Sequence, residues 1–348
     1  MSISSEGSAK KGDIIAHPAT GIQPADWQTA LAQGIADAAE LLRILAIEPE
    51  SLDAPFLAGS PFRVKVPLAF VGRMRRGDPH DPLLRQVLPI ASELDSAPGF
   101  VADPVGDEAA EVVPGVLRKY RGRVLLIASG ACAIHCRYCF RRHFSYGDSL
   151  ASRERWQSAL GYLREDTSIG EVILSGGDPL SLSDSKLERL VIALDEIPHL
   201  KRLRIHTRLP IVLPARVDSR LTGWLKRSRL RTIVVLHANH RNEIDSDVGL
   251  ACTRLCESGA TVLNQSVLLA GINDSVDALS TLSEALFENG VLPYYLHLLD
   301  PVAGAAHFQV AEHAGRNLVR QLRERLPGYL VPQLVREQFG EPYKTPLF

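Results

Sequence analysis

Short apolar runs recur along the second two-thirds of the chain, and segments with helical spacing lie between them. Six runs predict strands, at 123–129, 171–177, 202–207, 232–238, 261–269 and 293–299. The intervening segments, such as 183–197 and 275–290, carry apolar residues three and four apart, which is typical of amphipathic helices. Strands that alternate with helices in this way form a parallel sheet with right-handed crossovers.

This alternation predicts an α/β fold of the partial-barrel type. A complete eight-unit barrel takes about 250 residues, so six units over 111–325 fit an open, partial (β/α)6 barrel better. We expect a mainly helical region over 1–110, with one amphipathic helix at 25–45, and a C-terminal tail over 326–348 that closes one side of the opening. In such sheets the active site lies at the carboxyl ends of the strands.

Composition and charge exclude several classes of protein. The 348 residues are 45% hydrophobic and 23% charged, as in an ordinary globular enzyme, and 39 basic against 40 acidic residues leave a net charge of -1. We therefore expect no nucleic-acid partner and no membrane partner. The N-terminal residues lack the apolar stretch of a secretory signal, which favours a cytoplasmic enzyme.

Three of the five cysteines fall within eight residues, just after the first barrel strand. Cys132, Cys136 and Cys139 have C-x3-C-x2-C spacing. Thiolates are the usual ligands of iron–sulfur clusters, normally four per cluster, so three leave one iron open to a substrate or cofactor. The alternative is a structural zinc site completed by His135 or His143, but such sites usually draw their ligands from two separated pairs. The position at the catalytic end of the barrel favours the cluster.

Several long segments share their order and spacing with one known family. They are CRYCFRRHF at 136–144, SGGDPL at 175–180, RIHTRLPIVLPAR at 204–216, HANHRNEI at 237–244, NQSVLLAGIND at 264–274 and PYYLHLLD at 293–300. With the cysteine loop, they resemble the radical S-adenosylmethionine (SAM) lysine 2,3-aminomutase family, and most closely its branch that forms (R)-β-lysine for elongation factor P. The resemblance implies a radical SAM (β/α)6 partial barrel that uses a [4Fe-4S] cluster, SAM and pyridoxal 5'-phosphate (PLP).

By the same resemblance, the three loop cysteines bind the cluster and a second set of residues contacts SAM. That set is Tyr138, Ser175, Gly176, Gly177, Asp178, His237 and Gln265. Paired glycines after a strand let a ligand approach the backbone, and the resemblance implies that the ligand at the SGGD segment is SAM.

The C-terminal Lys344 matches the lysine that holds PLP as a Schiff base in the family, a bond that lysine amines readily form. Lys119, Tyr120 and Arg123 match the region that binds the PLP phosphate, where arginine forks suit phosphate oxygens. Lys119 stands where the clostridial-type enzymes have arginine.

Three charged residues match the family's substrate contacts. Arg141 matches the arginine that pairs with the α-carboxylate of lysine, and Asp300 and Glu337 match the two carboxylates around its ε-ammonium. A cation between two carboxylates selects lysine, because burying that charge unpaired is costly. Glu337 stands where the clostridial-type enzymes have aspartate.

The implied reaction converts L-α-lysine to (R)-β-lysine. A 5'-deoxyadenosyl radical removes a hydrogen from the β-carbon of lysine held as a PLP aldimine, and the nitrogen then migrates. An unidentified electron donor would feed the cluster, and the ligase that modifies elongation factor P would take the product. The alternatives are the same chemistry on glutamate or arginine, or a role in free β-lysine metabolism, whose enzymes resemble longer chains with a zinc-binding C-terminal extension that we expect to be missing here.

Two further pairs of residues carry weaker predictions. Cys252 and Cys256 lie four apart on a predicted helix and are expected to be structural. Arg208 and Arg216 lie on or just after the third predicted strand, where either could face the active site.

Overall fold

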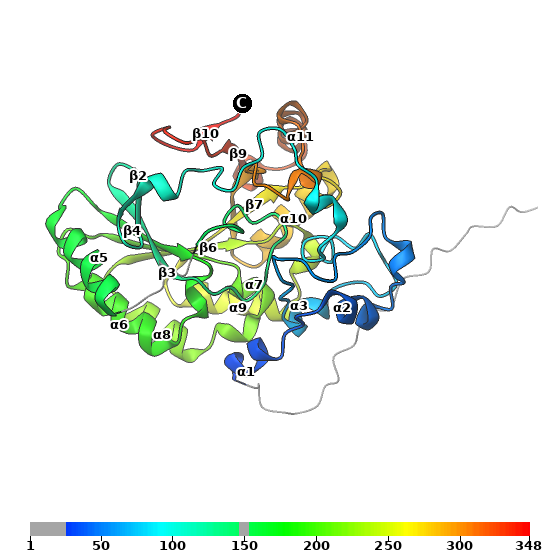
Figure 1. The fold of residues 1–348 in the computed structure, drawn as a ribbon. Coiled ribbons are helices and arrows are strands. Elements are labelled where there is room, and N and C mark those ends of the chain that lie inside the picture. Colours follow the sequence, from blue (N-terminus) through cyan, green and yellow to red (C-terminus); the bar gives the residue numbers. More distant parts are fainter. Residues whose placement is uncertain (1–25, 146–152) are drawn as a thin grey trace, which may run out of the picture.

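The computed structural model describes residues 26–145 and 153–348, which build one curved sheet of ten strands (Figure 1). The strands follow chain order across the sheet: β1 Glu111–Val113, β2 Val116–Tyr120, β3 Arg123–Ser129, β4 Glu171–Gly176, β5 Arg202–Thr207, β6 Arg231–His237, β7 Thr261–Leu268, β8 Leu292–Leu298, β9 Gln333–Arg336 and β10 Thr345–Pro346. Strands β3 to β9 are parallel, while β1 and β2 join β3 as antiparallel neighbours and β10 pairs antiparallel with β9. The six predicted strands correspond to β3–β8, with their ends shifted by at most one residue.

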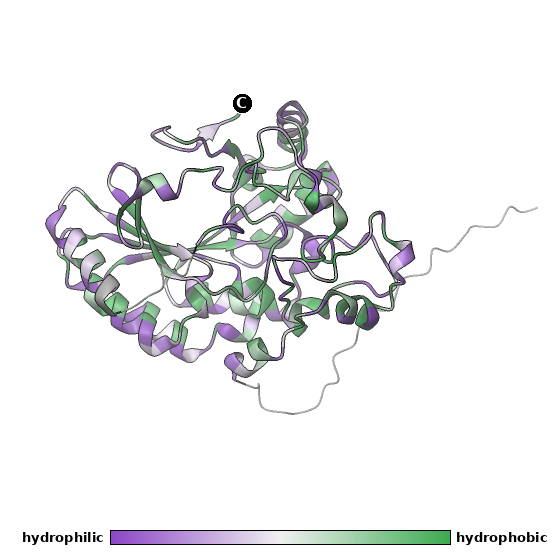
Figure 2. Ribbon diagram, viewed as in Figure 1, coloured by the Kyte–Doolittle hydropathy of each residue, from purple (hydrophilic) through white to green (hydrophobic). Residues whose placement is uncertain are grey.

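A helix follows each of the strands β3 to β8 and packs on the outside of the sheet (Figure 1). These helices are α5 Arg153–Glu165, α6 Asp184–Asp195, α8 Ser219–Arg227, α9 Ser246–Glu257, α10 Val276–Glu288 and α11 Glu312–Arg325, with the one-turn α7 Leu209–Val212 between β5 and α8. Figure 2 shows their apolar faces turned to the sheet and their polar faces turned outward. Within the described residues no pairing joins β1 to β10, so the predicted open (β/α)6 barrel is confirmed.

Short 3₁₀ helices mark the connections. They are η1 Pro49–Ser51, η2 Ala91–Leu94, η3 Glu108–Ala110, η4 Pro179–Ser181, η5 Pro214–Arg216, η6 Arg241–Glu243, η7 Ala306–Phe308 and η8 Gly328–Leu330. No helix in the described ranges is both long and apolar enough to cross a membrane.

The N-terminal region differs from its prediction. The single helix predicted at 25–45 is wrong, because the chain forms α1 Trp27–Ala32 and α2 Ala38–Leu45 with a break between them, followed later by α3 Leu68–Val71. At the break Ile35 exchanges two backbone hydrogen bonds with Val66, at 2.8 and 2.9 Å. Asp37 then starts α2 by accepting a hydrogen bond from the Glu40 amide at 2.8 Å. Both halves bury their apolar residues in the same core, so the spacing alone does not reveal the break.

One continuous apolar core connects this region to the barrel. The same buried cluster contains Leu41 and Phe70 from the N-terminal helices and Val124 and Leu236 from the sheet. The domain boundaries predicted at 110 and 325 stay predictions.

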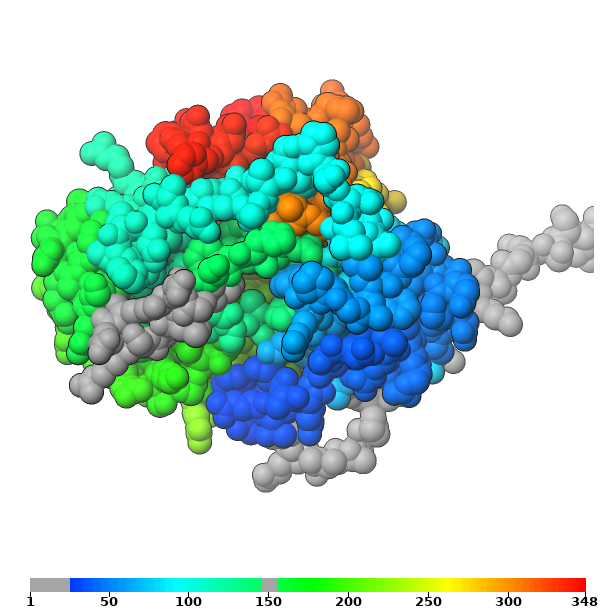
Figure 3. All heavy atoms as spheres, in the orientation of Figure 1, coloured from blue at the N-terminus to red at the C-terminus, as the bar shows by residue number. Residues whose placement is uncertain are grey.

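The C-terminal tail continues the sheet instead of only covering it. Strand β9 lies parallel to β8, and β10 returns antiparallel to β9, which the sequence patterns did not predict as strands. The tail also contacts the segment before β1, where the Phe339 ring lies against Gly106. Figure 3 shows the two segments, red and cyan, together on one face of the molecule. The tail thus lies beside the carboxyl ends of the barrel strands.

Candidate active site

A cavity of about 560 Å³ opens among the carboxyl ends of the parallel strands. All of the residues that the family resemblance assigned to a site line it: Lys119, Tyr120, Arg123, Cys132, Cys136, Tyr138, Cys139, Arg141, Ser175, Gly176, Gly177, Asp178, His237, Gln265, Asp300, Glu337 and Lys344. They lie on or after β2, β3, β4, β6, β7 and β8 and in the tail. Their grouping is a property of the fold, while their individual roles stay predictions.

The cysteine loop after β3 is fastened to the N-terminal region. The amide of His135 donates to the Lys65 carbonyl at 3.0 Å, and the amide of Arg137 donates to the Gln86 carbonyl at 2.9 Å. Arg137 is fully buried and pairs with Glu93 through Nε at 2.7 Å. Such a buried, two-sided attachment gives the loop a defined shape before any metal binds.

The three thiols of the cysteine loop lie at the wall of the cavity. All are free and line the cavity, and burial raises the pKa of Cys139 to about 11. Among the described residues, no three His, Cys, Asp or Glu side chains converge on one point as a zinc ion requires. A four-iron cluster takes each thiolate on a different iron, so its ligands need not converge.

The two histidines of the zinc alternative already have protein partners. His135 Nδ1 lies 2.8 Å from the Arg63 carbonyl, and its ring stacks on Phe62 with centroids 5.0 Å apart. His143 Nε2 lies 3.0 Å from the Ala303 carbonyl. Each of the two rings thus has one nitrogen in contact with a backbone carbonyl.

The SGGD segment at the end of β4 serves the packing of the chain as well as the cavity. A Cβ on Gly177 would lie 2.5 Å from the Ala131 carbonyl oxygen, and the Gly177 amide already donates to Ser129 at 2.7 Å. The glycines thus let the cysteine loop approach β4, which is a different use from the ligand approach expected from the sequence. The carboxylate of Asp178 accepts from Thr207 Oγ1 at 2.8 Å and from the Arg208 amide at 2.7 Å.

His237 and Gln265 stand opposite each other on β6 and β7, and their side chains are 3.0 Å apart. Burial, followed by the charge of Arg208, lowers the pKa of His237 to about 3, so its imidazole is neutral. Two further histidines line the cavity beside them, His206 on β5 and His297 on β8. Both have a buried Nε2 without a hydrogen-bond partner, so they can bind a polar ligand. The sequence places His206 at the carboxyl end of its strand, but it indicates a role for neither histidine.

The tail hairpin brings Glu337 and Lys344 together. The pairing of Thr345 with Arg336 places them side by side, and the Lys344 ammonium forms an ion pair with the Glu337 carboxylate. Lys119 Nζ lies 3.3 Å from the same carboxylate. Although burial opposes it, the charges of these two lysines lower the pKa of Glu337 to about 2.

Asp300, which follows β8, has a raised pKa, whereas the pKa of Glu337 is lowered. Its half-buried carboxylate lines the cavity. Desolvation there raises the pKa of Asp300 to about 7, against the opposing charge of Lys344 and with the help of Glu337. Glu337 is therefore ionised at neutral pH, while Asp300 is close to its midpoint and ready to gain a cationic partner.

Asp107 links two of the predicted binding residues and was missed by the sequence analysis. Its buried carboxylate lies 2.7 Å from Arg141 Nε and 2.6 Å from Lys119 Nζ. Arg141 Nη1 also donates to Ser175 at 3.0 Å. Asp107 lies in an irregular segment without periodicity, so no sequence signal distinguishes it from other loop aspartates.

Arg123 packs its guanidinium over the Tyr120 ring at 4.7 Å across the turn between β2 and β3. Of the two arginines that could face the site, Arg208 lines the cavity, whereas Arg216 is fully buried and pairs with Asp184 at 2.9 Å.

The remaining cysteines lie away from the cavity lining. Cys252 is buried in α9, and Cys256 on the same helix donates its thiol to the Gly290 carbonyl at 3.5 Å. Their expected structural role stays a prediction.

Comparison with known proteins finds relatives that share one name. The chain is 50% identical over 323 residues to the L-lysine 2,3-aminomutase of Escherichia coli, covering 92% of this chain and 94% of that one. It is 45% identical to the Haemophilus influenzae enzyme of the same name, covering 92% and 95%, and 34% identical to that of Clostridium subterminale, covering 92% and 77%. No family model matches the chain.

Among solved structures, a radical SAM methyltransferase from Sphaerobacter thermophilus is similar with a TM-score of 0.45 and 21% identity, over 64% of this chain and 68% of that one. That likeness is too low to support a conclusion about this chain. The sequence identities to the three lysine aminomutases are high enough, because each covers about nine-tenths of the chain. The chain belongs to the L-lysine 2,3-aminomutase family.

Proposed function

We propose that this chain is a radical SAM enzyme that converts L-lysine to (R)-β-lysine with a [4Fe-4S] cluster and PLP. The observation that carries the proposal is that one cavity gathers the thiol loop, the tail lysine and a pair of carboxylates. When bound, the cluster and SAM supply a carbon radical that removes a hydrogen atom from the substrate, and PLP supplies the carbonyl and π-system that stabilise the resulting radical. The relatives named L-lysine 2,3-aminomutase support the substrate.

At the thiol end, Cys132, Cys136 and Cys139 would hold three irons and leave the fourth open to SAM. The neutral His237 and its neighbour Gln265 offer hydrogen bonds without a competing positive charge. Once SAM, PLP and lysine fill it, a cavity with buried walls would leave little room for water beside a reactive radical.

At the tail end, Lys344 would carry PLP, and its ion pair with Glu337 holds its ammonium inside the cavity beforehand. The ε-ammonium of a bound lysine would pair with the carboxylates of Glu337 and Asp300, which line the same cavity.

The ion pair of Asp107 with Arg141 Nε holds the guanidinium in one orientation. Arg141 would then pair with the α-carboxylate of the substrate. A glutamate substrate would place its side-chain carboxylate against Asp300 and Glu337, which repels it. We also propose that (R)-β-lysine passes to the ligase that modifies elongation factor P, and that an unidentified electron donor reduces the cluster.

The test is an anaerobic assay of the reconstituted protein with SAM, PLP, dithionite and free amino acids. L-Lysine should give (R)-β-lysine on a chiral column, and L-glutamate and L-arginine should give no β-amino acid. Turnover of arginine or glutamate in preference to lysine would refute the substrate, and the (S) product would refute the stereochemistry. A protein that carries stoichiometric zinc and no iron would refute the enzyme class.

A further inference from the structure

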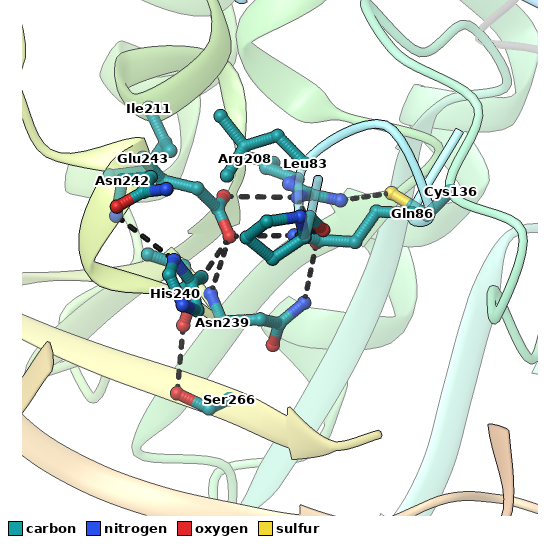
Figure 4. Close-up of polar contacts among 12 residues, drawn as sticks. Leu83, Gln86, Cys136, Arg208, Ile211, Asn239, His240, Asn242, Glu243 and Ser266 are labelled. Carbon is teal, nitrogen blue, oxygen red and sulfur yellow. Dashed lines mark hydrogen bonds and ion pairs between the residues drawn. The ribbon is translucent and has the colours of Figure 1, made fainter. Parts of the chain in front are cut away.

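A buried arginine outside the predicted site touches one of the cluster cysteines (Figure 4). Arg208 directly follows β5, and its side chain is 6% exposed. Its Nη1 lies 2.7 Å from Cys136 Sγ and 2.6 Å from the Tyr138 hydroxyl. The positive charge of the guanidinium is thus in direct contact with a predicted cluster ligand.

The other side of the guanidinium is held by two residues from separate segments. Nη2 donates to Gln86 Oε1 at 2.6 Å and to Glu243 Oε2 at 3.0 Å. Glu243 is fully buried, and its other oxygen accepts from Gln86 Nε2 at 3.1 Å and from the Asn239 amide at 2.8 Å. Figure 4 shows these side chains converging from the N-terminal region and from the segment after β6.

The backbone of Arg208 is fixed as well. Its amide and that of Leu209 donate to Asp178 Oδ2 at 2.7 and 3.1 Å. Asp178 belongs to the SGGD segment, so the strand end that lines the SAM side of the cavity also aims Arg208 at Cys136. Backbone and side chain are therefore held in one orientation.

A fixed charge beside a cluster ligand changes how readily the cluster accepts an electron. Cluster potentials depend on net charge, on hydrogen bonds to the sulfurs and on solvent exposure. With three thiolates the oxidised cluster is already anionic, and reduction adds one electron while no bond forms or breaks. In a buried site of low effective dielectric, a cation next to a thiolate stabilises the reduced state, and a nearby anion opposes it.

On the basis of the proposed function, we propose that Arg208 is a positioning residue that raises the reduction potential of the cluster through Cys136, and that Glu243 limits this effect. A merely structural role would make the removal of either partner disturb the site in the same direction. The electrostatic role requires opposite directions.

The experiment is a redox titration of the reconstituted protein, with dithionite as the electron source and the reduced cluster followed by electron paramagnetic resonance. Arg208→Gln should lower the equilibrium constant for reduction by about tenfold, which is a midpoint about 59 mV more negative for a one-electron couple. Glu243→Gln keeps the acceptor oxygen but removes the charge, and its midpoint should become more positive. Arg208→Lys keeps the charge and should shift less than Arg208→Gln.

Arg216→Gln is the matched control, because Arg216 is also buried and ion-paired but does not line the cavity. Its midpoint should equal that of the parent protein. Unchanged midpoints in both Arg208→Gln and Glu243→Gln, or shifts of the same sign, would overturn the inference. Should Arg208→Gln fail to fold, the sign of the Glu243→Gln shift decides alone, since only a positive shift supports the inference.

Iron and sulfide content separates this inference from the function on which it rests. A parent protein that binds no cluster would overturn the proposed function and the inference with it. A parent that binds four irons and cleaves SAM, with variants whose midpoints do not move as described, would overturn the role of Arg208 alone.

Discussion

Replacing Asp300 with asparagine should make the cofactor-free protein more stable at alkaline pH. The pKa of Asp300 rises from 3.8 to about 7 on folding, mainly through desolvation. The folded protein therefore binds this proton more tightly than the unfolded chain does. Its contribution to stability is complete below pH 3.8 and is lost as the pH rises to about 7.

The pKa difference sets the size of the effect. A shift of one unit corresponds to about 1.4 kcal/mol, so the free energy of unfolding falls by up to about 4 kcal/mol between pH 4 and pH 8 because of this one group. Asparagine cannot ionise and lacks this slope. Since the half-buried carboxylate faces a cavity that admits water, about 4 kcal/mol is the upper limit of the gain in Asp300→Asn.

Urea unfolding at pH values from 5 to 8.5 measures the effect. Asp274→Asn makes the same chemical change at an exposed position and serves as the control. The free-energy difference between Asp300→Asn and the parent should grow from pH 5 and level off above about pH 7, while the Asp274→Asn difference stays constant. If the free energy of unfolding of the Asp300 variant and of the parent depended on pH in the same way, a desolvated carboxylate at this place in the cavity would be refuted. In the active enzyme the same change should raise the KM for lysine, because a binding partner for the ε-ammonium is lost.

Three further substitutions test other parts of the site. Lys344→Ala should abolish the imine absorbance of added PLP while the iron content is unchanged, and a persistent imine band would refute Lys344 as its carrier. Cys136→Ala should remove iron and SAM cleavage together, whereas Cys252→Ala should retain both; iron retained in Cys136→Ala would contradict the cluster assignment. Gly177→Ala should lower the free energy of unfolding by more than about 3 kcal/mol, because its Cβ would press on the Ala131 backbone. Gly161→Ala, in α5 with open space around it, should raise stability by up to about 1 kcal/mol, and equal effects would show that the close approach at the SGGD segment is not needed.

The barrel was predictable because its strands and helices follow from the spacing of apolar residues within short segments. Apolar runs of strand length separated by amphipathic helices leave little freedom in an α/β fold, so β3–β8 match the prediction closely. The break between α1 and α2 was not predictable, since it depends on the pairing of Ile35 with Val66 from a later segment. The tail strands β9 and β10 are short, and β9 depends on its pairing with β8 from an earlier part of the chain.

The candidate site divides in the same way. Motifs carried by contiguous residues, such as the cysteine loop, could be identified from the sequence together with the family resemblance. Contacts made across the fold could not: Asp107 joins Lys119 to Arg141, and Arg208 reaches Cys136, only because the sheet curls. His206 lies on β5 and His297 lies on β8, and both line the cavity. In the sequence each histidine has apolar or small neighbours, as a polar residue has in any half-buried strand.

If one cavity joins radical generation to a bound lysine, hydrogen must pass from the β-carbon of lysine to the 5'-carbon derived from SAM. The reconstituted protein is incubated with SAM, PLP, dithionite and L-lysine carrying deuterium on its β-carbon, and the products are analysed by mass spectrometry. β-Lysine should form, and deuterium should be found in the SAM or 5'-deoxyadenosine that is recovered. β-Lysine formed with no deuterium in either compound would rule out hydrogen transfer through SAM.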